Sequence, residues 1–406
     1  MIPISEAAKI IKGESFSLET ETIDLTDSVG RVLAEDVFAD SDLPPFDRSQ
    51  MDGFAVRTTD VGEVRENNSV KLKIIGESVA GKGFNGEVKR DEAVRIMTGA
   101  RVPGGADSVQ KKESARESGG KNGESFVEIF EAAKFGQNIV SKGAEIETGE
   151  KVFDKGEVIT APMIAPLASF GYAKVEVYKR PKVAILATGS EIVDINETPR
   201  KDQIRNSNSL TLKVFAEEIA DAEVLPIAVD EIENLKSQIQ NALENCDVLI
   251  ISGGVSVGDY DFTKPALREL GAEILFEKIA LRPGKPTVFA KLNGKLIFGL
   301  PGNPVSVAVT FFLFVRAALM KMQGATDYRL KNGHALLSQK IKGAKGRDSF
   351  LPAFVATNEK GKLVVESLRF GGSANFIEFA RANALVFVPQ DENLEAAAIA
   401  KILFLP

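Results

Sequence analysis

The sequence has little of the side-chain chemistry that most metal and nucleophilic sites use. Its 406 residues include one cysteine, Cys246, and one histidine, His334. A single cysteine excludes an intrachain disulfide and a thiolate-ligated zinc site, and we predict that it is a small core residue of a protein from a reducing compartment. His334 lies in a polar stretch, where a lone histidine is usually solvated. The sequence therefore argues against Ser-His-Asp or Cys-His catalysis and against histidine-ligated transition metals.

Long apolar runs and a basic charge excess are also missing. The longest apolar run, residues 305–315, is interrupted by Arg316, falls short of the ~18 residues that cross a bilayer, and predicts a buried helix. Residues 1–12 show no charged leader followed by an apolar core, so we expect no secretory signal. A net charge of −7 argues against a general nucleic-acid surface. We expect a cytoplasmic protein with neither nucleic acid nor a membrane as partner.

The polar side chains that remain are carboxylates, cations and hydroxyls. Carboxylate oxygens suit Mg²⁺, while Lys, Arg and loop N–H groups suit oxyanions, so phosphoryl chemistry is the first hypothesis. No P-loop sequence is present. Residues 81–86 match the spacing of a dinucleotide-binding motif, but they lie in a β-rich segment with no helix after them, and we interpret them as a turn.

Four regions of the chain differ in their pattern of apolar residues. Helical spacing predicts a helical domain made from residues 1–40 and 140–176. Short β-like runs separated by Gly and Asn turns predict a small β-rich domain over residues 41–139. Alternating strands and helices predict a doubly wound α/β domain with a parallel sheet over residues 177–325. Short strands return in residues 326–406, which predict a terminal β domain.

Three glycine-containing loops follow predicted strands of the α/β domain, at residues 187–191, 252–258 and 299–304. Ligands of open parallel sheets bind at the carboxyl ends of the strands. Glycine lets the backbone approach a ligand, and the N–H groups of the following helix favour an anion. Any one such loop could equally be an ordinary βα turn, but three together predict a phosphate or oxyanion site.

Acidic residues follow the same strands. Glu191, Asp230, Asp259 and Asp261 could converge at one edge of the sheet and hold Mg²⁺ beside a bound phosphate. For each of them a helix N-cap or a solvated loop acid is the alternative, above all for Asp259. Glu191 and Asp261 are the stronger candidates for metal ligands.

Cations recur on one proline-stiffened loop. Lys278, Arg282 and Lys285 lie within the sequence Lys-Ile-Ala-Leu-Arg-Pro-Gly-Lys-Pro, and rigidly held cations suit a phosphate clamp. A solvated basic loop explains the same spacing equally well.

Four motifs together resemble the molybdopterin molybdenumtransferase (MoeA) family. They are Pro-Phe-Asp-Arg-Ser-Gln-Met-Asp-Gly-Phe-Ala-Val at residues 45–56, Arg-Ile-Met-Thr-Gly-Ala at 95–100, the loop at 252–258 and Leu-Pro-Gly-Asn-Pro at 300–304. The resemblance covers essentially the whole chain. It implies an elongated helical domain, an inserted β domain, a molybdopterin-binding α/β domain and a C-terminal β barrel. It also implies a homodimer whose active cleft joins the α/β domain of one subunit to the β-domain motifs of the other.

The resemblance also implies a reaction. Adenylylated molybdopterin and molybdate would be the substrates, with Mg²⁺-dependent cleavage of the phosphoanhydride, loss of AMP and capture of molybdenum by the dithiolene sulfurs. Asp52 and Thr98 of the β domain and Glu191, Asp230 and Asp261 of the α/β domain would be catalytic, with Glu191 and Asp261 as Mg²⁺ ligands. The residues implied to bind substrate are Ser252, Gly253, Gly254, Ser256, Lys278, Arg282, Lys285, Pro301, Gly302 and Pro304.

Some positions depart from the common family pattern. Gln50 and Phe54 alter the Met-Asp-Gly motif, Arg282 replaces a lysine and keeps its charge, and Ser190 replaces a frequent acid, which leaves fewer carboxylates for a metal.

Two other functions fit parts of the sequence. A molybdopterin adenylyltransferase shares the α/β domain and its Ser-Gly-Gly loop, but the additional domains argue against it. A non-catalytic scaffold, as in gephyrin's similar domain, would need a linker or tail that is not evident here. For the enzyme, the implied protein partners are the adenylyltransferase and the apo-molybdoenzymes.

Overall fold

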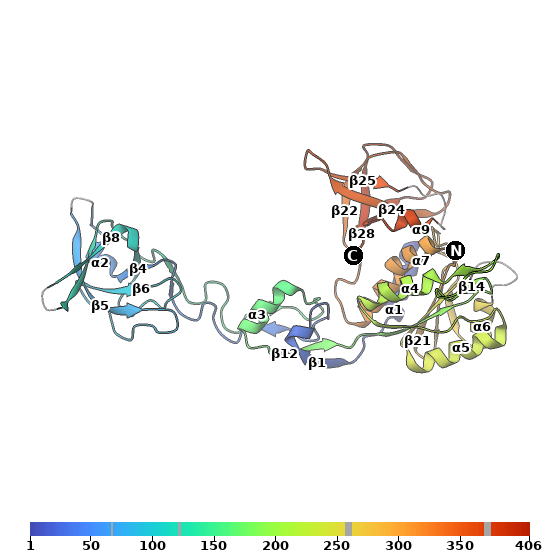
Figure 1. Ribbon diagram of the computed structural model, residues 1–406, viewed down its shortest axis with the longest axis horizontal. Coiled ribbons are helices and arrows are strands. Elements are labelled where there is room, and N and C mark those ends of the chain that lie inside the picture. Colours follow the sequence, from blue (N-terminus) through green and yellow to red (C-terminus); the bar gives the residue numbers. More distant parts are fainter. Residues whose placement is uncertain (66–67, 121–122, 256–261, 369–374) are drawn as a thin grey trace. The chain divides into compact units, whose positions relative to one another are not determined.

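The computed structural model of the chain describes residues 1–65, 68–120, 123–255, 262–368 and 375–406, which fold into two compact units (Figure 1). Unit 1 contains Met1–Glu35, Lys155–Ile164 and Ala173–Pro406. Unit 2 contains Asp36–Asp154 and Ala165–Tyr172. Each unit has its own sheets and its own core, and each is therefore described by itself.

Unit 1 is built around a six-stranded sheet in the order β16-β13-β17-β21-β20-β18. The strands are β16 (Asp221–Val224), β13 (Lys182–Ala187), β17 (Val248–Ser252), β21 (Lys295–Leu300), β20 (Val288–Leu292) and β18 (Glu273–Phe276). The first four are parallel, and β20 runs antiparallel to both of its neighbours, β21 and β18, so the predicted parallel sheet contains one reversed strand. Asn293 and Gly294, with φ of 51° and 76°, form a tight hairpin between β20 and β21, which leaves no room for a crossover helix.

Helices cover both faces of this sheet, as predicted for a doubly wound domain. One apolar core joins the sheet to α4 (Ser207–Glu217) and to the long helix Pro304–Met322, and the other joins it to α5 (Ile232–Asn245) and α6 (Thr263–Glu269). Successive strand residues alternate between the two cores, as the two-residue period of a strand requires. Cys246 lies in the second core at 2% exposure, which confirms it as a core residue, and burial raises the pKa of its thiol to about 11.

The helix Pro304–Met322 is longer than the apolar run that predicted it. It consists of α7 (Pro304–Thr310), a π-helical turn η5 (Phe311–Val315) and α8 (Arg316–Met322). Its 19 residues are long and apolar enough to cross a membrane by composition, but 78% of its apolar window is buried inside the protein. The prediction of a buried helix is confirmed, and Arg316 does not end it.

The N-terminal segment is less helical than its apolar spacing predicts. Helix α1 (Ile4–Glu14) buries Ala7 and Ile11 in the first core of unit 1. It is followed by strand β1 (Thr20–Asp24), which pairs antiparallel with β12 (Lys174–Tyr178), and by a 3-10 turn η1 (Leu25–Asp27). The helical prediction for residues 1–40 is wrong after Glu14, because β-branched Thr20, Thr22 and Ile23 favour a strand that can pair with β12. Within residues 140–176, helix is confined to η4 (Ala161–Met163) and α3 (Ile164–Ser169).

Unit 2 contains a six-stranded sheet in the order β7-β4-β6-β5-β9-β8. The strands are β7 (Ser108–Lys111), β4 (Gly53–Val56), β6 (Glu92–Ile96), β5 (Val70–Ser78), β9 (Ser125–Ile129) and β8 (Ala115–Gly119). The short elements of the unit are α2 (Thr58–Val61), η2 (Lys112–Ser114) and the pairs β2 (Val37–Phe38) with β11 (Lys151–Phe153) and β3 (Arg48–Ser49) with β10 (Ile139–Val140). Residues 81–86 form no helix, in agreement with their interpretation as a turn.

The remainder of unit 1 is a β barrel. Its strands follow the order β19-β24-β25-β22-β28-β26, and β24 also pairs with β26, which closes the ring. They are β19 (Leu281–Arg282), β24 (Asp348–Thr357), β25 (Leu363–Ser367), β22 (Asn332–Leu337), β28 (Ile399–Phe404) and β26 (Ala384–Val388), with β23 (Ile341–Lys342), β27 (Asn393–Leu394) and α9 (Phe376–Phe379) beside them. His334 is exposed on strand β22 rather than in a loop. The predicted α/β plus β architecture is confirmed, while the exact limits of four domains stay a prediction.

Gly53 of strand β4 provides a test of how tightly unit 2 is built. A Cβ there would overlap the carbonyl oxygen of Gln110 on β7 and lie 2.9 Å from its carbonyl carbon. We expect Gly53→Ala to lower the free energy of unfolding by about 1–3 kcal/mol or more, because the paired backbones must separate. Gly119→Ala is the matched control, since nothing lies within 4 Å of its Cβ position. Thermal unfolding followed by circular dichroism would contradict the expectation if both variants melted alike.

Candidate functional site

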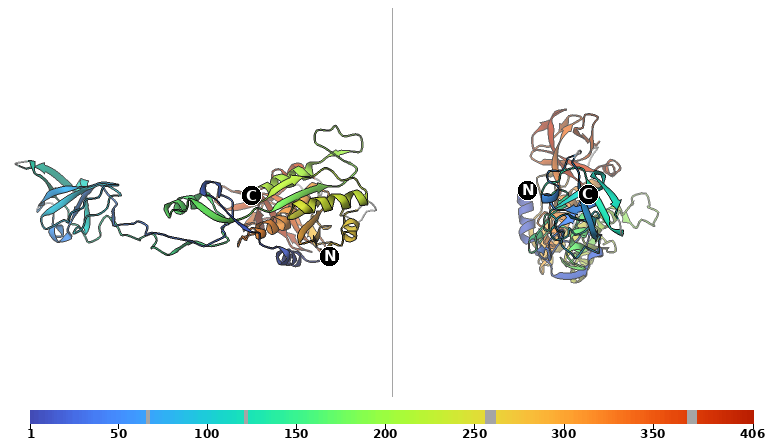
Figure 2. Two further views of the ribbon diagram at one scale, coloured as in Figure 1. Left: turned by 90° about the horizontal axis from the view of Figure 1, so that it is seen from below. Right: turned by 90° about the vertical axis from the view of Figure 1, so that its left-hand side faces the viewer.

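A cleft of about 860 Å³ lies in unit 1 at the carboxyl ends of β13, β17 and β21. Its volume is within the range of small-molecule and cofactor sites. Residues from all three predicted loops line it, together with residues of the short parallel pair β14 (Ile192–Val193) and β15 (Ile204–Arg205). The segment between β14 and β15 stands out from the α/β domain as a loop (Figure 2). The predicted residues that line the cleft are Glu191, Asp230, Ser252, Gly253, Gly254, Pro301, Gly302 and Pro304.

The loops after β13 and β17 touch each other through glycine. Gly253 and Gly254 have φ of 101° and 59°, a region that side chains disfavour. A Cβ on Gly253 would overlap the carbonyl oxygen of Thr188, and one on Gly254 would lie 2.7 Å from Oγ1 of Thr263. The N–H of Gly253 donates to the carbonyl of Leu300 at 3.1 Å, which ties the loop to the third strand as well. These glycines hold the three loops together, so their role is close packing in addition to any approach of a ligand.

Asn208, which the sequence analysis missed, bridges two of the loops. From α4 its Nδ2 donates to the carbonyl of Gly302 at 2.7 Å and to Oγ of Ser252 at 3.3 Å. The side chain of Asn206 caps the same helix by accepting from the N–H of Ser209 at 3.1 Å. The Asn-Ser-Asn-Ser sequence at residues 206–209 is a helix-start signal that could have drawn attention to this segment. Only the fold reveals that Asn208 then faces Ser252 and Gly302.

Asp230 holds the loop at residues 187–191 through two hydrogen bonds. Its Oδ1 accepts from Oγ1 of Thr188 at 2.9 Å, and its Oδ2 accepts from the N–H of Ser190 at 2.7 Å. Both carboxylate oxygens therefore fix the loop at residues 187–191. Asp230 lines the cleft and is half-buried, which makes it a positioning residue by its contacts, and its predicted catalytic role stays a prediction.

Glu191 also lines the cleft, but among the residues that the structure describes its side chain does not hold a loop as that of Asp230 does. Its carboxylate forms no hydrogen bond or ion pair with the described residues. Gly189 makes room for it, because a Cβ there would lie 2.6 Å from Oε2 of Glu191. In the described part of the chain, no three acid, histidine or cysteine side chains gather to hold a metal. Ser256, Asp259 and Asp261 lie outside the described residues, so the second predicted Mg²⁺ ligand stays a prediction.

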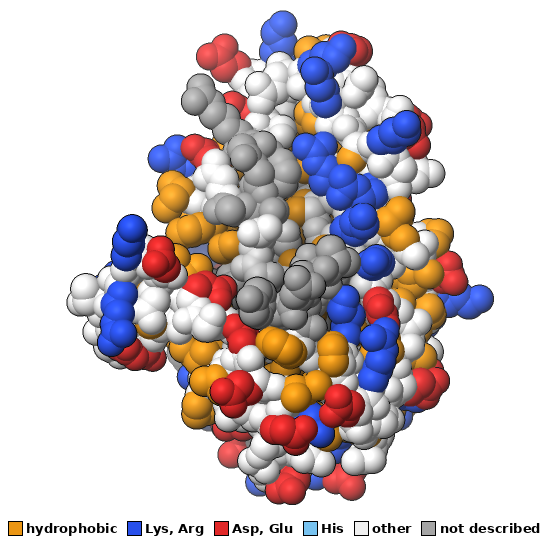
Figure 3. All heavy atoms as spheres, turned by 90° about the vertical axis from the view of Figure 1, so that its right-hand side faces the viewer, with side chains coloured by type: hydrophobic (Ala, Val, Ile, Leu, Met, Phe, Trp, Pro, Cys, Tyr) orange, Lys and Arg blue, Asp and Glu red, His pale blue; other side chains and the backbone are white. Residues whose placement is uncertain are grey.

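The three predicted cations lie on a loop that borders the cleft through Pro286. None of them is among the residues that line the cleft. Lys285 is exposed, Lys278 is half-buried, and Nη1 of Arg282 lies 3.4 Å from the carbonyls of Lys342 and Gly343. The loop is held by a hydrogen bond from the N–H of Ile279 to the carbonyl of Lys285 at 3.0 Å. On the face seen in Figure 3, Lys and Arg side chains gather along a band, which gives an acidic protein a local positive surface.

In unit 2, Asp52 and Thr98 meet as a hydrogen-bonded pair. The N–H and Oγ1 of Thr98 both donate to Oδ1 of Asp52, each at 2.7 Å. The Thr98 N–H, the Thr98 hydroxyl and then the charge of Lys112 hold the pKa of the Asp52 carboxyl below its usual value. The other oxygen of Asp52 accepts no hydrogen bond from the residues described by the structure. The two motifs that the sequence marked separately therefore form one anionic group.

The same kind of pair occurs twice more in unit 2. Thr148 donates through N–H and Oγ1 to Asp42, each at 2.7 Å, and Lys142 with these donors lowers the pKa of Asp42 to about 2. Thr58 also donates twice to Asp107, through its N–H to Oδ1 at 2.6 Å and through Oγ1 to Oδ2 at 2.8 Å. The pairing alone is therefore a structural device. Asp52 and Thr98 differ from the other two pairs because both of their residues are exposed.

Taken together, the fold and the cleft define a multidomain α/β protein with a cleft of small-molecule size at the carboxyl ends of its central strands. Three family models match consecutive parts of the chain: the MoeA N-terminal region (domain I and II) at residues 2–171, a probable molybdopterin binding domain at 184–321, and the MoeA C-terminal region (domain IV) at 334–405. The chain belongs to the MoeA family.

Individual relatives agree with this assignment. The chain is 37% identical over 389 residues to the molybdopterin molybdenumtransferase of Staphylococcus aureus strain COL, covering 96% of this chain and 91% of the relative. It is 36% identical to the enzyme of the same name from Haemophilus influenzae, covering 96% and 95%. The crystal structure of the molybdopterin biosynthesis MoeA protein from Pyrococcus horikoshii is 30% identical, with a TM-score of 0.85 and 100% coverage of both chains.

The Asp52–Thr98 pair makes a pH-dependent prediction. Thr98→Val removes the hydroxyl donor and leaves the N–H, so we expect the pKa of Asp52 to rise towards its ordinary value. Because the native pKa is lowered, these contacts stabilise the fold above the pKa of an unfolded aspartate and lose that effect as the pH falls through the lowered value. Carboxyl ¹³C NMR titration measures the shift directly. The control, Thr58→Val, should leave Asp52 unchanged, and an unchanged pKa in Thr98→Val would contradict the assignment.

Proposed function

We propose that the chain is a molybdopterin molybdenumtransferase of molybdenum cofactor biosynthesis. It inserts molybdate into adenylylated molybdopterin, releases AMP and yields Mo-molybdopterin. The observation that carries the proposal is the cleft at the ends of β13, β17 and β21, within a chain that matches enzymes of this name over 96% of its length. Neither an adenylyltransferase nor a scaffold is favoured, because the full-length relatives bear the transferase name.

The cleft supplies two kinds of contact for the substrate. The Oγ of Ser252 and the backbone of Gly253, Gly254 and Gly302 line it with small polar groups that admit a pterin and a phosphate closely. Pro304 is the first residue of the long helix, so the positive end of that helix faces the cleft and favours an anion. Pro301 and Pro304 stiffen this wall.

Positively charged side chains are proposed to stabilise the departing AMP. We assign Lys278, Arg282 and Lys285 to the phosphates or the incoming molybdate, whose negative charge they offset. Charge that develops as AMP departs is stabilised by donors that are already in place, which is how preorganised sites lower a barrier. Pro283 follows Arg282 and Pro286 follows Lys285, so the two prolines restrict the backbone beside these two cations.

The residues of the cleft fit a magnesium ion that is shared with the substrate. Mg²⁺ is commonly held by one or two carboxylates together with substrate phosphates, and Glu191 offers an unpartnered carboxylate at the wall. Glu191 would hold the ion, and Asp261 is the second proposed ligand. When bound, the ion would neutralise phosphoanhydride oxygens and make AMP a better leaving group.

We further propose that the enzyme is a homodimer in which the exposed Asp52–Thr98 pair of one subunit completes the cleft of the other. An anionic group with a lowered pKa stays charged at neutral pH and can orient a metal-bound or protonated reactant. The proposed location is the cytoplasm, and the proposed partners are the adenylyltransferase that makes the substrate and the apo-molybdoenzymes that receive the product.

Molybdate-dependent release of AMP tests the proposal. Purified protein is incubated with adenylylated molybdopterin, Mg²⁺ and molybdate, and AMP is measured by chromatography. We expect release that requires molybdate. In Glu191→Gln, the Mg²⁺ concentration for half-maximal rate should rise roughly tenfold or more, a loss seen even for indirect partners of a metal. Glu197→Gln, which changes an exposed acid outside the cleft, is the control. Absence of molybdate-dependent release, with ATP consumed on free molybdopterin instead, would point to the adenylyltransferase.

Mixing two impaired variants, at a Mg²⁺ concentration too low to support release by Glu191→Gln alone, tests whether the site is shared between subunits. Asp52→Ala and Glu191→Gln chains are combined and allowed to exchange subunits. If each cleft combines Glu191 of one chain with Asp52 of the other, about half of the dimers are mixed and carry one intact cleft, so about a quarter of the wild-type AMP release should return. A site within one chain restores no activity in any mixture, and this result would refute the shared cleft.

A further inference from the structure

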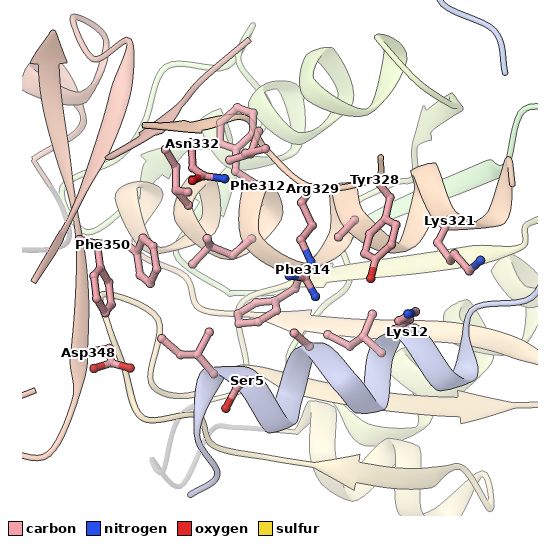
Figure 4. A pocket seen from close by; sticks show the side chains of 18 of the residues that line it. Ser5, Lys12, Phe312, Phe314, Lys321, Tyr328, Arg329, Asn332, Asp348 and Phe350 are labelled. Carbon is pink, nitrogen blue, oxygen red and sulfur yellow. The ribbon is translucent and has the colours of Figure 1, made fainter. Parts of the chain in front are cut away.

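A second cavity of about 480 Å³ lies elsewhere in unit 1 and shares no lining residue with the cleft. Its walls come from helix α1, from the helix Pro304–Met322 and from strands β22, β24, β26 and β28 of the barrel (Figure 4). Its volume falls within the range of small-molecule sites. The proposed transferase chemistry does not use any of these residues.

The body of this cavity is apolar. The π-helical turn η5 contributes three successive residues, Phe312, Leu313 and Phe314, to its lining. Such turns occur frequently at functional sites. From the barrel come Phe350 and Phe387, whose ring centroids are 5.1 Å apart. Aromatic walls from two different elements therefore enclose one space.

Cations without acidic partners gather at one end. Lys12, Lys321 and Arg329 line the cavity around Tyr328, and Figure 4 shows them on the side away from Asp348. The Nζ of Lys12 lies 5.9 Å and the Cζ of Arg329 lies 5.6 Å from the centre of the Tyr328 ring. Within the described ranges, none of the three cations forms an ion pair with a carboxylate. Oδ1 of Asp348 instead accepts from the N–H of Gln390 at 2.9 Å.

The cations, which no described carboxylate neutralises, lie beside an apolar cavity. This combination favours a ligand that is both anionic and apolar. Lys12 and Arg329 are exposed and Lys321 is half-buried, so bringing these cations together around one ring costs a partly screened Coulomb energy, which a bound anion would recover. The aromatic walls favour an apolar body of matching size. We propose that this cavity binds a small organic anion, with its charged group between Lys12, Lys321 and Arg329 and its alkyl or aromatic body against Phe312, Phe314 and Phe350.

The amphipathic dye 8-anilinonaphthalene-1-sulfonate is the first probe. Fluorescence titration of the folded full chain should show saturable binding at one site per chain. N-phenyl-1-naphthylamine, which has the same rings without the sulfonate, should bind roughly tenfold more weakly, the ratio expected for a charge-assisted contact. Equal binding of both compounds would overturn the proposed anion site.

Variants locate the dye. Arg329→Gln and Lys12→Gln should each weaken dye binding roughly tenfold, while Lys9→Gln, on the same helix and outside the cavity, should not change it. Ala8→Phe places a ring in the cavity from partly exposed α1 and should abolish binding without loss of thermal stability. If Ala8→Phe and the two cation variants all bind the dye as the wild type does, the site lies elsewhere and the inference is wrong.

Competition defines the body of the ligand. Octanoate and 1-naphthoate are each titrated against the bound dye. Displacement by octanoate would identify an alkyl anion, and displacement by 1-naphthoate would identify an aromatic one. Displacement by neither would show that the dye reports an incidental surface rather than an anion site, and would overturn the proposal.

Discussion

The cleft depends on the close approach of two backbones. Where the loop after β17 meets the loop after β13, a side chain at Gly253 would overlap the carbonyl oxygen of Thr188, so the contact exists only because that side chain is absent. The contact fixes the spacing of the loops that carry Ser252 and Glu191. Asn208 and the N–H of Gly253 then link the third loop, through Gly302 and Leu300. The floor of the cleft is therefore rigid before any ligand arrives.

This rigidity explains why neighbouring acids have different roles. Asp230 uses both oxygens to hold Thr188 and Ser190, which keeps the first loop against the second. Glu191, on that loop, is left without a partner among the described residues and faces the cleft. An ionised carboxylate has about four lone-pair positions, so Asp230 has fewer of them left for a ligand than Glu191 has. By its contacts Asp230 holds the loop, and Glu191 is the acid whose carboxylate is left open for the proposed chemistry.

The sequence predicted those features that follow from local pattern. An apolar run predicted β21, the presence of a single cysteine predicted the core position of Cys246, and strand ends predicted that the loops with Ser252 and Gly302 would meet. The direction of β20 was missed although Asn293-Gly294 is a local hairpin signal, whereas the strand at Thr20–Asp24 could not be predicted because its partner is about 150 residues away. The sequence also did not predict that Asn208 bridges two loops or that Asp230 holds the first loop. Both depend on contacts between segments that are distant in sequence.

The helix Pro304–Met322 contributes residues to both the cleft and the second cavity. Its first residue, Pro304, lines the cleft, and Phe312, Phe314 and Lys321 line the second cavity. Its remaining faces pack against the sheet and α1, so almost the whole circumference is apolar, which accounts for a composition that would suit a bilayer. The π turn at Phe311–Val315 shifts the following residues around the axis, so that the aromatic side chains face the cavity while Ala318 and Leu319 stay in the core. Such turns occur frequently at functional sites, and the cavity beside Phe311–Val315 provides a reason for this one.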